Sequence, residues 1–291
     1  MTFFLTAISL IAFAANSLLC RMALGDNLID PISFTTLRLA SGALMLLIVS
    51  QRRTNAARPV KAKGSWKSAL ALFAYACAFS LGYKSVTAGM GTLILVGSVQ
   101  ITMIGWAVAS GEKLSFLKWL GSAISMSGLV YLVLPGISAP DPIGTILMFI
   151  SGAAWGVYTI RGKDAAAPIA MTSANFYWAA PLAILASVIF SASTHLEPAG
   201  VLLAVISGSI TSALGYVVWY KALRHLTTSQ ASIVQLLIPV LTAFGGVAFL
   251  SEHISGRLLI GSSLILGGVG MGIIKKTHQD SSSSECSTLE P

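Results

Sequence analysis

Three aromatic side chains recur every four residues in one apolar stretch of the chain: Tyr75, Phe79 and Tyr83. Residues four apart share one face of a helix, so these rings would line one side of it. Rings for an apolar group and hydroxyls for a polar one suit contact with a small amphiphilic ligand. Anchoring at the membrane interface is the alternative for Tyr83, Trp219 and Tyr220, which lie near the ends of apolar stretches.

Neutral amides and further rings lie deep in other apolar stretches. The amides are Asn16, Gln100 and Gln235, and the rings are Trp155, Tyr158 and Tyr216. Pro239 cannot donate to the carbonyl of Gln235, so we expect a helix kink with a free carbonyl beside an amide. We predict that these groups line a substrate cavity with Tyr75, Phe79 and Tyr83. For the two glutamines, an interhelical hydrogen bond is the equally weighted alternative.

One charged residue, Arg38, lies inside an apolar stretch, seven residues after Pro31 and about 10 Å along a helix from it. A cation at that depth faces the bundle interior or a water-filled cavity. It acts either as an anchor for a substrate carboxylate or as a structural group that snorkels or bonds to backbone carbonyls. Both roles fit the sequence.

Groups for catalysis and energy coupling are missing from the apolar stretches. The chain contains no Walker A, HExxH or GxSxG motif. All 10 Asp and Glu and all 4 His fall at the ends of these stretches or outside them. We therefore expect no enzyme activity, cofactor or metal. Proton-driven carriers usually need an intramembrane carboxylate or histidine, so facilitated transport is favoured over proton antiport.

The elements that position these residues are transmembrane helices. Of the 291 residues, 55% are apolar and 10% charged, against about 25% charged in soluble domains. A soluble surface cannot be covered with so little charge, so the class is an all-α, polytopic membrane protein. Ten segments are long enough to span the bilayer: 2–21, 32–50, 66–85, 88–110, 116–134, 142–160, 169–191, 199–220, 229–250 and 257–274.

Basic residues predict how the chain is oriented. Of 18 Lys and Arg, 14 fall on the side of the N-terminus, and only Arg21, Lys84 and Arg257 fall on the other. The positive-inside rule then places both termini in the cytoplasm. It also explains the net charge of +8 without a nucleic-acid partner.

The termini and the cysteines need separate interpretations. A cleavage-like sequence in the first span lacks the basic segment of a signal peptide, so we expect that span to be retained. The polar, Ser-rich tail 277–291 is expected to be disordered. Cys20, Cys77 and Cys286 have no metal or disulfide spacing and are taken as structurally neutral.

The two halves of the chain resemble each other. EKLSFLKWLGSAISMSG, from Glu112, aligns with EHISGRLLIGSSLILGG, from Glu252, in its Glu, Gly-Ser and later Gly. Residues 1–136 and 137–276 therefore form two five-helix repeats. Five is odd, so the second repeat is inverted in the membrane, an arrangement typical of transporters. We predict ten transmembrane helices arranged as two inverted repeats around a central cavity.

Glycines mark the fifth and tenth spans as packing elements. They are Gly121, Gly128, Gly261 and Gly268, each pair seven residues apart on one helix face. Such spacing indicates close helix contact and not a binding site. We expect both spans to lie outside the cavity.

The spacing of Pro31 and Arg38, the Glu and Gly patterns of spans five and ten, and the 5+5 arrangement resemble the drug/metabolite transporter superfamily, EamA type. Two stretches, GTLILVGSVQITM (Gly91–Met103) and Leu134–Gly162, are similar to YddG-type exporters of aromatic and other amino acids. The resemblance implies amino-acid export across a bacterial inner membrane. A counterpart of Arg38 is general in the superfamily across varied substrates, which favours its structural role.

Other functions fit the sequence less well. A multidrug or other metabolite exporter of the same superfamily is the main alternative. A membrane enzyme would need acidic or histidine clusters at the interface, and a channel would need a polar stripe or charged rings. The sequence shows neither. We expect a monomer whose partners are small molecules and the bilayer.

Overall fold

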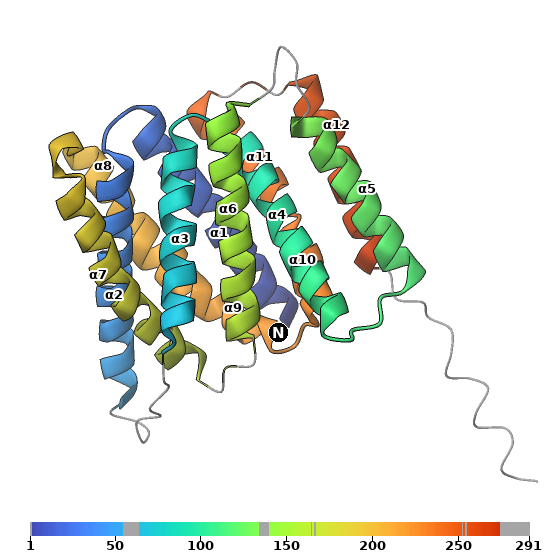
Figure 1. Ribbon diagram of the computed structural model, residues 1–291, viewed down its shortest axis with the longest axis horizontal. Coiled ribbons are helices and arrows are strands. Elements are labelled where there is room, and N and C mark those ends of the chain that lie inside the picture. The colour runs from blue at the N-terminus through green and yellow to red at the C-terminus, as the bar shows by residue number, and fades with distance from the viewer. Residues whose placement is uncertain are drawn as a thin grey trace, which may run out of the picture.

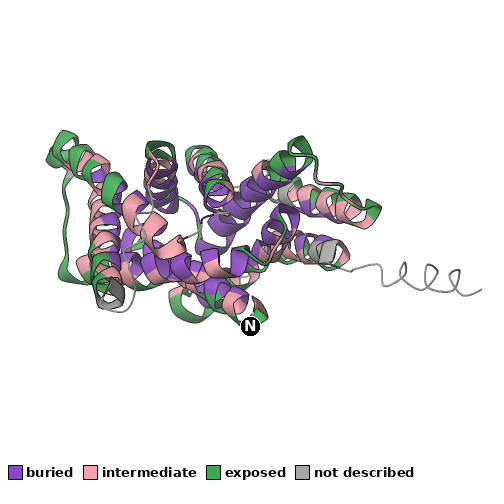
Figure 2. Cartoon of the chain, turned by 90° about the horizontal axis from the view of Figure 1, so that it is seen from below, coloured by how far each residue is buried: buried purple, intermediate pink, exposed green. Residues whose placement is uncertain are grey.

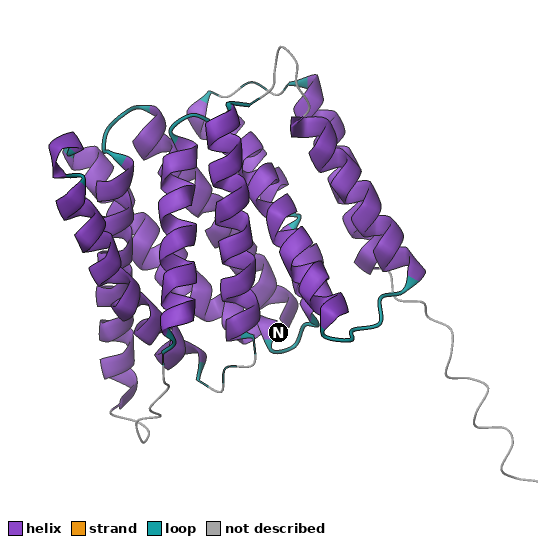
Figure 3. Cartoon of the chain, viewed as in Figure 1, coloured by secondary structure: helices purple, strands orange, loops and turns teal. Residues whose placement is uncertain are grey.

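The computed structural model describes residues 2–54, 64–133, 140–163, 165, 167–251, 253 and 255–273. Within these ranges the regular structure is helical (Figure 3). The first half contains α1 (Thr2–Gly25), α2 (Pro31–Thr54), α3 (Trp66–Tyr83), α4 (Ala88–Ala109) and α5 (Phe116–Val133). The second half contains α6 (Pro142–Gly162), α7 (Pro168–Ile189), α8 (Pro198–Ile206), η2 (Ser207–Leu214), α9 (Gly215–Leu223), α10 (Thr228–Gln235), α11 (Ile238–Leu250) and α12 (Gly256–Ile273), with a short 3-10 turn η1 (Ser191–Ser193).

The helices form ten membrane-crossing segments. Seven are long and apolar enough to cross a bilayer by length and composition alone, with α8, η2 and α9 forming one segment and α10 and α11 another. The others are α3, α5 and α12, of 18 residues each. At about 1.5 Å per residue, 18 residues approach the roughly 30 Å thickness of the hydrocarbon core. The predicted spans therefore agree with the structure.

Helix boundaries repeat along the chain at a fixed interval. α5 and α12 begin and end 140 residues apart, as do the starts of α1 and α6. Thr87 caps α4 and Thr227 caps α10, each accepting a hydrogen bond from the backbone amide three residues later. The fold is therefore a pair of five-helix repeats, inverted because each repeat has an odd number of spans.

Apolar side chains cover the outside of the bundle as well as its interior. Phe3, Phe116 and Phe249 are 86%, 77% and 73% exposed. Buried residues gather in the middle when the bundle is seen along its helices (Figure 2). An apolar exterior of this kind faces lipid, which is as apolar as the core.

The pair α5 and α12 stands at one edge of the bundle (Figure 1). The two helices approach closely at their glycines. A Cβ added to Gly268 would lie 2.2 Å from the carbonyl oxygen of Gly121, and one added to Gly128 would lie 3.0 Å from the carbonyl oxygen of Gly261. Ser125 Oγ also donates across the contact to the Ile265 carbonyl at 3.2 Å. Small residues permit this approach.

The third and fourth crossing segments of the second half are irregular, whereas α3 and α4, the corresponding segments of the first half, are regular. η2 is a π-helix between α8 and α9, and the last segment breaks between Gln235 and Ile238. There Leu236 and Leu237 donate to carbonyls three residues earlier, and Pro239 lies in the first turn of α11. Proline cannot continue the ladder of hydrogen bonds from α10, which accounts for the break. π-Helical segments are frequent at functional sites.

Candidate functional site

Trp155 and Gln235 meet at the centre of the bundle. The indole nitrogen of Trp155, on α6, donates to Gln235 Oε1, on α10, at 2.8 Å. The Gln235 amide nitrogen donates to the Ala231 carbonyl at 3.0 Å and contacts the Met103 sulfur at 3.5 Å. Both side chains are buried, at 4% and 0% exposure. The last residue of α10, just before the helix break, thus positions its amide against the indole.

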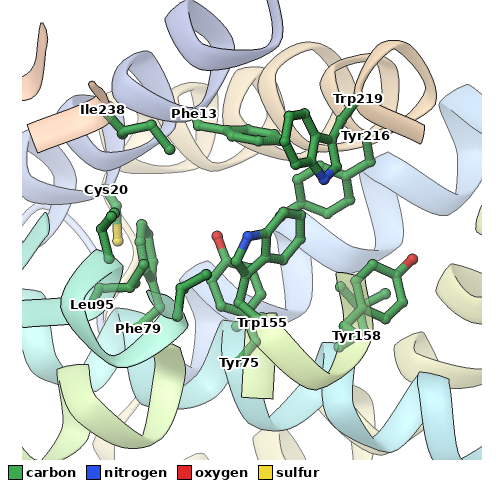
Figure 4. Close-up of a cluster of buried hydrophobic side chains, with 14 of the residues drawn as sticks. Phe13, Cys20, Tyr75, Phe79, Leu95, Trp155, Tyr158, Tyr216, Trp219 and Ile238 are labelled. Carbon is green, nitrogen blue, oxygen red and sulfur yellow. The ribbon is translucent and has the colours of Figure 1, made fainter. Parts of the chain in front are cut away.

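Aromatic rings surround the Trp155 indole (Figure 4). Tyr75 lies 5.1 Å away and Tyr216 4.7 Å away, both tilted, measured between ring centroids. Phe13, on α1, meets Trp155 edge-on at 5.3 Å, and also Tyr216 and Trp219 at 5.8 and 5.7 Å. Edge-to-face and tilted pairs of this separation are favourable. Phe13 joins both sides of the cluster, and sequence reasoning did not identify it as a site residue.

A small cavity lies beside this cluster, between the two halves of the chain. Its volume is about 20 Å³, room for about one water molecule. Its lining residues come from α1, α3, α4, α6, α10 and α11: Phe13, Ser17, Tyr75, Phe79, Thr92, Leu95, Val96, Trp155, Gln235 and Ile238. A ligand site needs about 300 Å³ or more, so the cavity in this structure is too small to hold an amino acid.

Four of the residues expected in the cavity line it: Tyr75, Phe79, Trp155 and Gln235. Phe13, two hydroxyl side chains and three aliphatic side chains complete the lining. These residue types are common in so apolar a sequence and do not mark a site. Their place in the wall depends on how each helix is rotated about its axis, which spacing along a single helix does not determine.

The other five expected residues lie behind the lining. Tyr83 packs edge-on against Phe79 at 4.7 Å, and its hydroxyl is 2.6 Å from Thr92 Oγ1. Gln100 is buried in α4, one turn beyond the lining residue Val96. The remaining three are Asn16, Tyr158 and Tyr216.

Tyr158 and Tyr216 stack on the ring cluster, at 5.7 and 4.7 Å from Trp155. Tyr220 meets Tyr158 edge-on at 5.8 Å between ring centroids, and its hydroxyl donates to the Tyr158 carbonyl at 3.0 Å. Tyr158 follows Trp155 on α6, and Tyr216 and Tyr220 lie on α9, so these tyrosines extend toward the end of the bundle where α1 begins. Rings therefore fill the bundle between the cavity and that end.

Asn16 is held by the π-helix. Its side-chain oxygen accepts from the hydroxyls of Ser207 at 2.6 Å, Thr211 at 3.2 Å and Ser212 at 3.4 Å. Its amide nitrogen points to the Tyr75 hydroxyl at 3.5 Å. The wide turn of η2 brings three hydroxyls of one helix to a single oxygen.

Arg38, on α2, lies next to this network. Its Nε donates to Ser212 Oγ at 2.9 Å, and its Nη2 donates to the hydroxyls of Tyr75 at 3.0 Å and Tyr216 at 2.9 Å. The guanidinium carbon sits 5.1 Å from the Tyr75 ring and 4.9 Å from the Phe79 ring. Among the described residues, the hydrogen bonds found for the Arg38 side chain go to hydroxyls and not to the backbone carbonyls that a structural role predicted. Hydroxyls and ring faces hold the guanidinium instead.

Polar contacts close the bundle at the end where α1 begins, which carries Lys118, Arg161 and Lys163 and is called the basic side below. Glu112, in the loop before α5, accepts from the Ser229 hydroxyl at the start of α10, and Lys118 Nζ donates to the same hydroxyl at 2.8 Å. Arg161 donates to Ser65 at 2.9 Å and Ser68 at 3.0 Å. Both contacts join the first half of the chain to the second.

Polar contacts are also present at the opposite end of the bundle. Asp30 and His195 form two hydrogen bonds. The backbone amide of Asp30 donates to the His195 carbonyl at 3.0 Å, and the Asp30 carboxylate accepts from the backbone amide of His195 at 3.1 Å. Arg21 also donates to the Tyr83 carbonyl at 2.9 Å.

Two inverted five-helix repeats around a central cavity are an arrangement typical of transporters. Residues 142–273 match the EamA-like transporter family, and the chain belongs to that family. It is a transporter and not an enzyme.

Known proteins are similar to this chain over 69% to 93% of its length. It is 44% identical to an uncharacterized protein of Pseudomonas aeruginosa over 93% of each chain. It is 24% identical to a probable terminal-alkyne amino-acid exporter of Streptantibioticus cattleyicolor over 69% of each chain. A solved crystal structure superposes with a TM-score of 0.69 at 20% identity, covering 91% of this chain and 98% of that one, and shows the same fold.

Proposed function

We propose that this transporter exports amino acids, aromatic or other small amphiphilic ones, across a bacterial inner membrane. The observation that carries the proposal is the cavity wall. It combines the rings of Phe13, Tyr75 and Trp155 with the amide of Gln235, and it lies between two inverted halves. Aromatic walls accommodate side chains of varied size, because one methylene changes binding by only about 1–3 kcal/mol. The similarity to an amino-acid exporter, although distant, supports the same substrate class.

Transport in this proposal is facilitated and not driven by protons. Asp30 directly precedes α2, and its carboxylate caps that helix by accepting hydrogen bonds from the backbone amides of Ile32 and Ser33. Its side chain is thus used at the end of the bundle and does not reach the cavity. A proton relay through the cavity would need an ionisable group there.

A counterflow assay tests the substrate class. Purified protein in liposomes is loaded with unlabelled amino acid, and uptake of labelled phenylalanine, leucine and threonine is measured against empty liposomes. The proposal predicts stimulated uptake, with phenylalanine and leucine ahead of threonine. Uptake of lipophilic cations without uptake of any amino acid would instead indicate a multidrug exporter.

The proposal also places both termini in the cytoplasm, with residues 1–136 and 137–276 as the two repeats of a monomer. Cysteines at Lys113 and Lys84 test the orientation, because both side chains are exposed and lie at opposite ends of the bundle. In a variant without the native cysteines, an impermeant thiol reagent added to intact cells should label Lys84→Cys and spare Lys113→Cys. The reverse pattern would contradict the orientation.

A further inference from the structure

Arg38 has a donor without a partner in the middle of the bundle. The side chain is 1% exposed, and its Nη1 has no hydrogen-bond partner among the described residues. Nε and Nη2 bond only to hydroxyls. Buried polar groups are normally satisfied, so an unused guanidinium donor points to a partner that arrives from elsewhere.

The charge of Arg38 is also unpaired. Among the described residues, the ion pairs join Lys118 to Glu112 and His195 to Glu197, both far along the chain from Arg38 and at the bundle ends. Hydroxyls and rings stabilise a cation but do not neutralise it. A buried charge is strongly disfavoured unless it is paired, so this site attracts an anion more strongly than an exposed arginine would.

One layer of rings separates Arg38 from the cavity. Tyr75 and Phe79 line the cavity, and the guanidinium lies within 5.1 Å of both ring centroids. Tyr75 is the shared element, because its hydroxyl occupies Nη2 and its ring contacts Trp155. A shift of the Tyr75 side chain would therefore open the Nη1–Nη2 edge to a ligand in the cavity.

We propose that Arg38 is the carboxylate-recognition residue of the transporter, and that Tyr75 covers it in this structure. The carboxylate of a bound solute takes the unused Nη1 and replaces the Tyr75 hydroxyl on Nη2, giving the bidentate geometry that guanidinium and carboxylate favour. This inference rests on the proposed export of amino acids and assigns one residue to the group that they all share.

Arg38 also connects the two halves of the chain. It bonds to Tyr75 of the first half and to Ser212 and Tyr216 of the second. Exchanging Tyr75 for a carboxylate removes a contact between α2 and α3 and keeps those with η2 and α9. Recognition of the substrate is thus linked to the relative position of helices that form the wall.

Three related compounds test the proposal by competition against labelled phenylalanine counterflow: phenylalanine, phenylalaninamide, which lacks the carboxylate, and 3-phenylpropionate, which lacks the ammonium. The native protein should prefer both carboxylates over the amide by at least tenfold, because hydrogen bonds to charged groups are among the strong ones. Arg38→Gln should lose that preference, and Arg38→Lys should keep a reduced one. Monodispersity and thermal stability of each variant are recorded.

Tyrosine variants keep the test decisive if Arg38→Gln does not fold. Tyr75→Phe keeps the ring and frees the N–H of Nη2 that Tyr75 occupies, while the bond from Nη2 to Tyr216 remains, so the preference for carboxylates over the amide should rise severalfold. Tyr220→Phe is the matched control, because that buried hydroxyl donates to the Tyr158 carbonyl and not to Arg38. Its ratio should equal that of the native protein.

Two results overturn the proposal: an unchanged preference in folded Arg38→Gln, or equal ratios in Tyr75→Phe and Tyr220→Phe. Both leave amino-acid export standing, since phenylalanine would still be transported. Absence of counterflow with every amino acid would overturn the proposed function and, with it, the recognition of a substrate carboxylate.

Discussion

The indole N–H of Trp155 donates to the side-chain oxygen of Gln235 at 2.8 Å, and this bond ties α6 to the end of α10 at the helix break. Both side chains also line the cavity. The bond therefore joins the cavity wall to the irregular part of the ninth crossing segment. A ligand that enters between the rings must displace or reorient this pair.

Trp155→Phe tests that relationship. Phenylalanine keeps a ring against Phe13 and Tyr75 but leaves Gln235 Oε1 without its donor, a loss of about 1–3 kcal/mol for a buried acceptor. We expect counterflow to fall several-fold while expression and monodispersity persist. Phe244→Leu is a suitable control, because Phe244 is 67% exposed on the outer surface of α11. Normal transport by Trp155→Phe would remove Trp155 from the binding wall.

Packing between α5 and α12 predicts opposite effects for two adjacent glycines. A Cβ at Gly268 meets the backbone oxygen of Gly121 at 2.2 Å, whereas a Cβ at Gly267 meets nothing within 4 Å. Gly268→Ala should destabilise the protein by about 1–3 kcal/mol through overpacking. Gly267→Ala should leave stability unchanged or raise it slightly, because alanine is the better helix former.

Thermal unfolding followed by fluorescence-detected size exclusion measures both glycine variants. A lower melting temperature for Gly268→Ala alone would support a packing role for this helix pair. Equal stability of the two variants, with transport lost only in Gly268→Ala, would place the pair in the transport machinery.

Hydropathy predicted the crossing segments closely because the bilayer leaves the chain few choices. Backbone groups in lipid must bond within the segment, so an apolar run of sufficient length becomes a helix. The run 88–110, for example, became α4 over Ala88–Ala109. The repeat was equally visible, since its Glu and Gly positions recur in register.

The interior could not be predicted in the same way. Phe13 is one of twelve phenylalanines, and nothing in the neighbouring sequence marks it as a ring that meets three others. The π-helix has no local signal in Ser207–Leu214, yet it brings Ser212 to Arg38, 174 residues earlier in the chain. Such contacts depend on helix rotation and on tertiary packing, which periodicity along one helix does not contain.

Collapse of the proton gradient should leave transport intact. The cavity is lined by hydroxyls, an amide, rings and aliphatic groups, with no carboxylate or histidine among its lining residues. We expect equal initial rates of phenylalanine efflux from liposomes with and without an ionophore that equalises pH. Accumulation against a phenylalanine gradient, driven by an imposed pH gradient, would show proton coupling and contradict a facilitator.

The last prediction concerns the closure at the basic side. Partial burial raises the pKa of the Glu112 carboxyl. Hydrogen bonds from Ser229 and Thr227 and the charge of Lys118 lower that pKa by more than burial raises it, so the net effect is a lowered pKa. A carboxylate whose pKa is lower in the folded state stabilises the fold above its ordinary pKa, about 4.3. That stabilisation is lost as the pH falls through the lowered value.

Glu112→Gln should therefore reduce the melting temperature near neutral pH, and the difference from the native protein should shrink as the pH falls below about 4. Glu197→Gln is the control, because Glu197 and His195 form an exposed pair, and such pairs contribute little. Glu112 joins the first half to the start of α10, so the same variant should also open the basic side more often and raise the rate of thiol labelling at a cysteine placed at Thr228. A melting difference that stays constant with pH would mean that the shape of Glu112, and not its charge, holds this end closed.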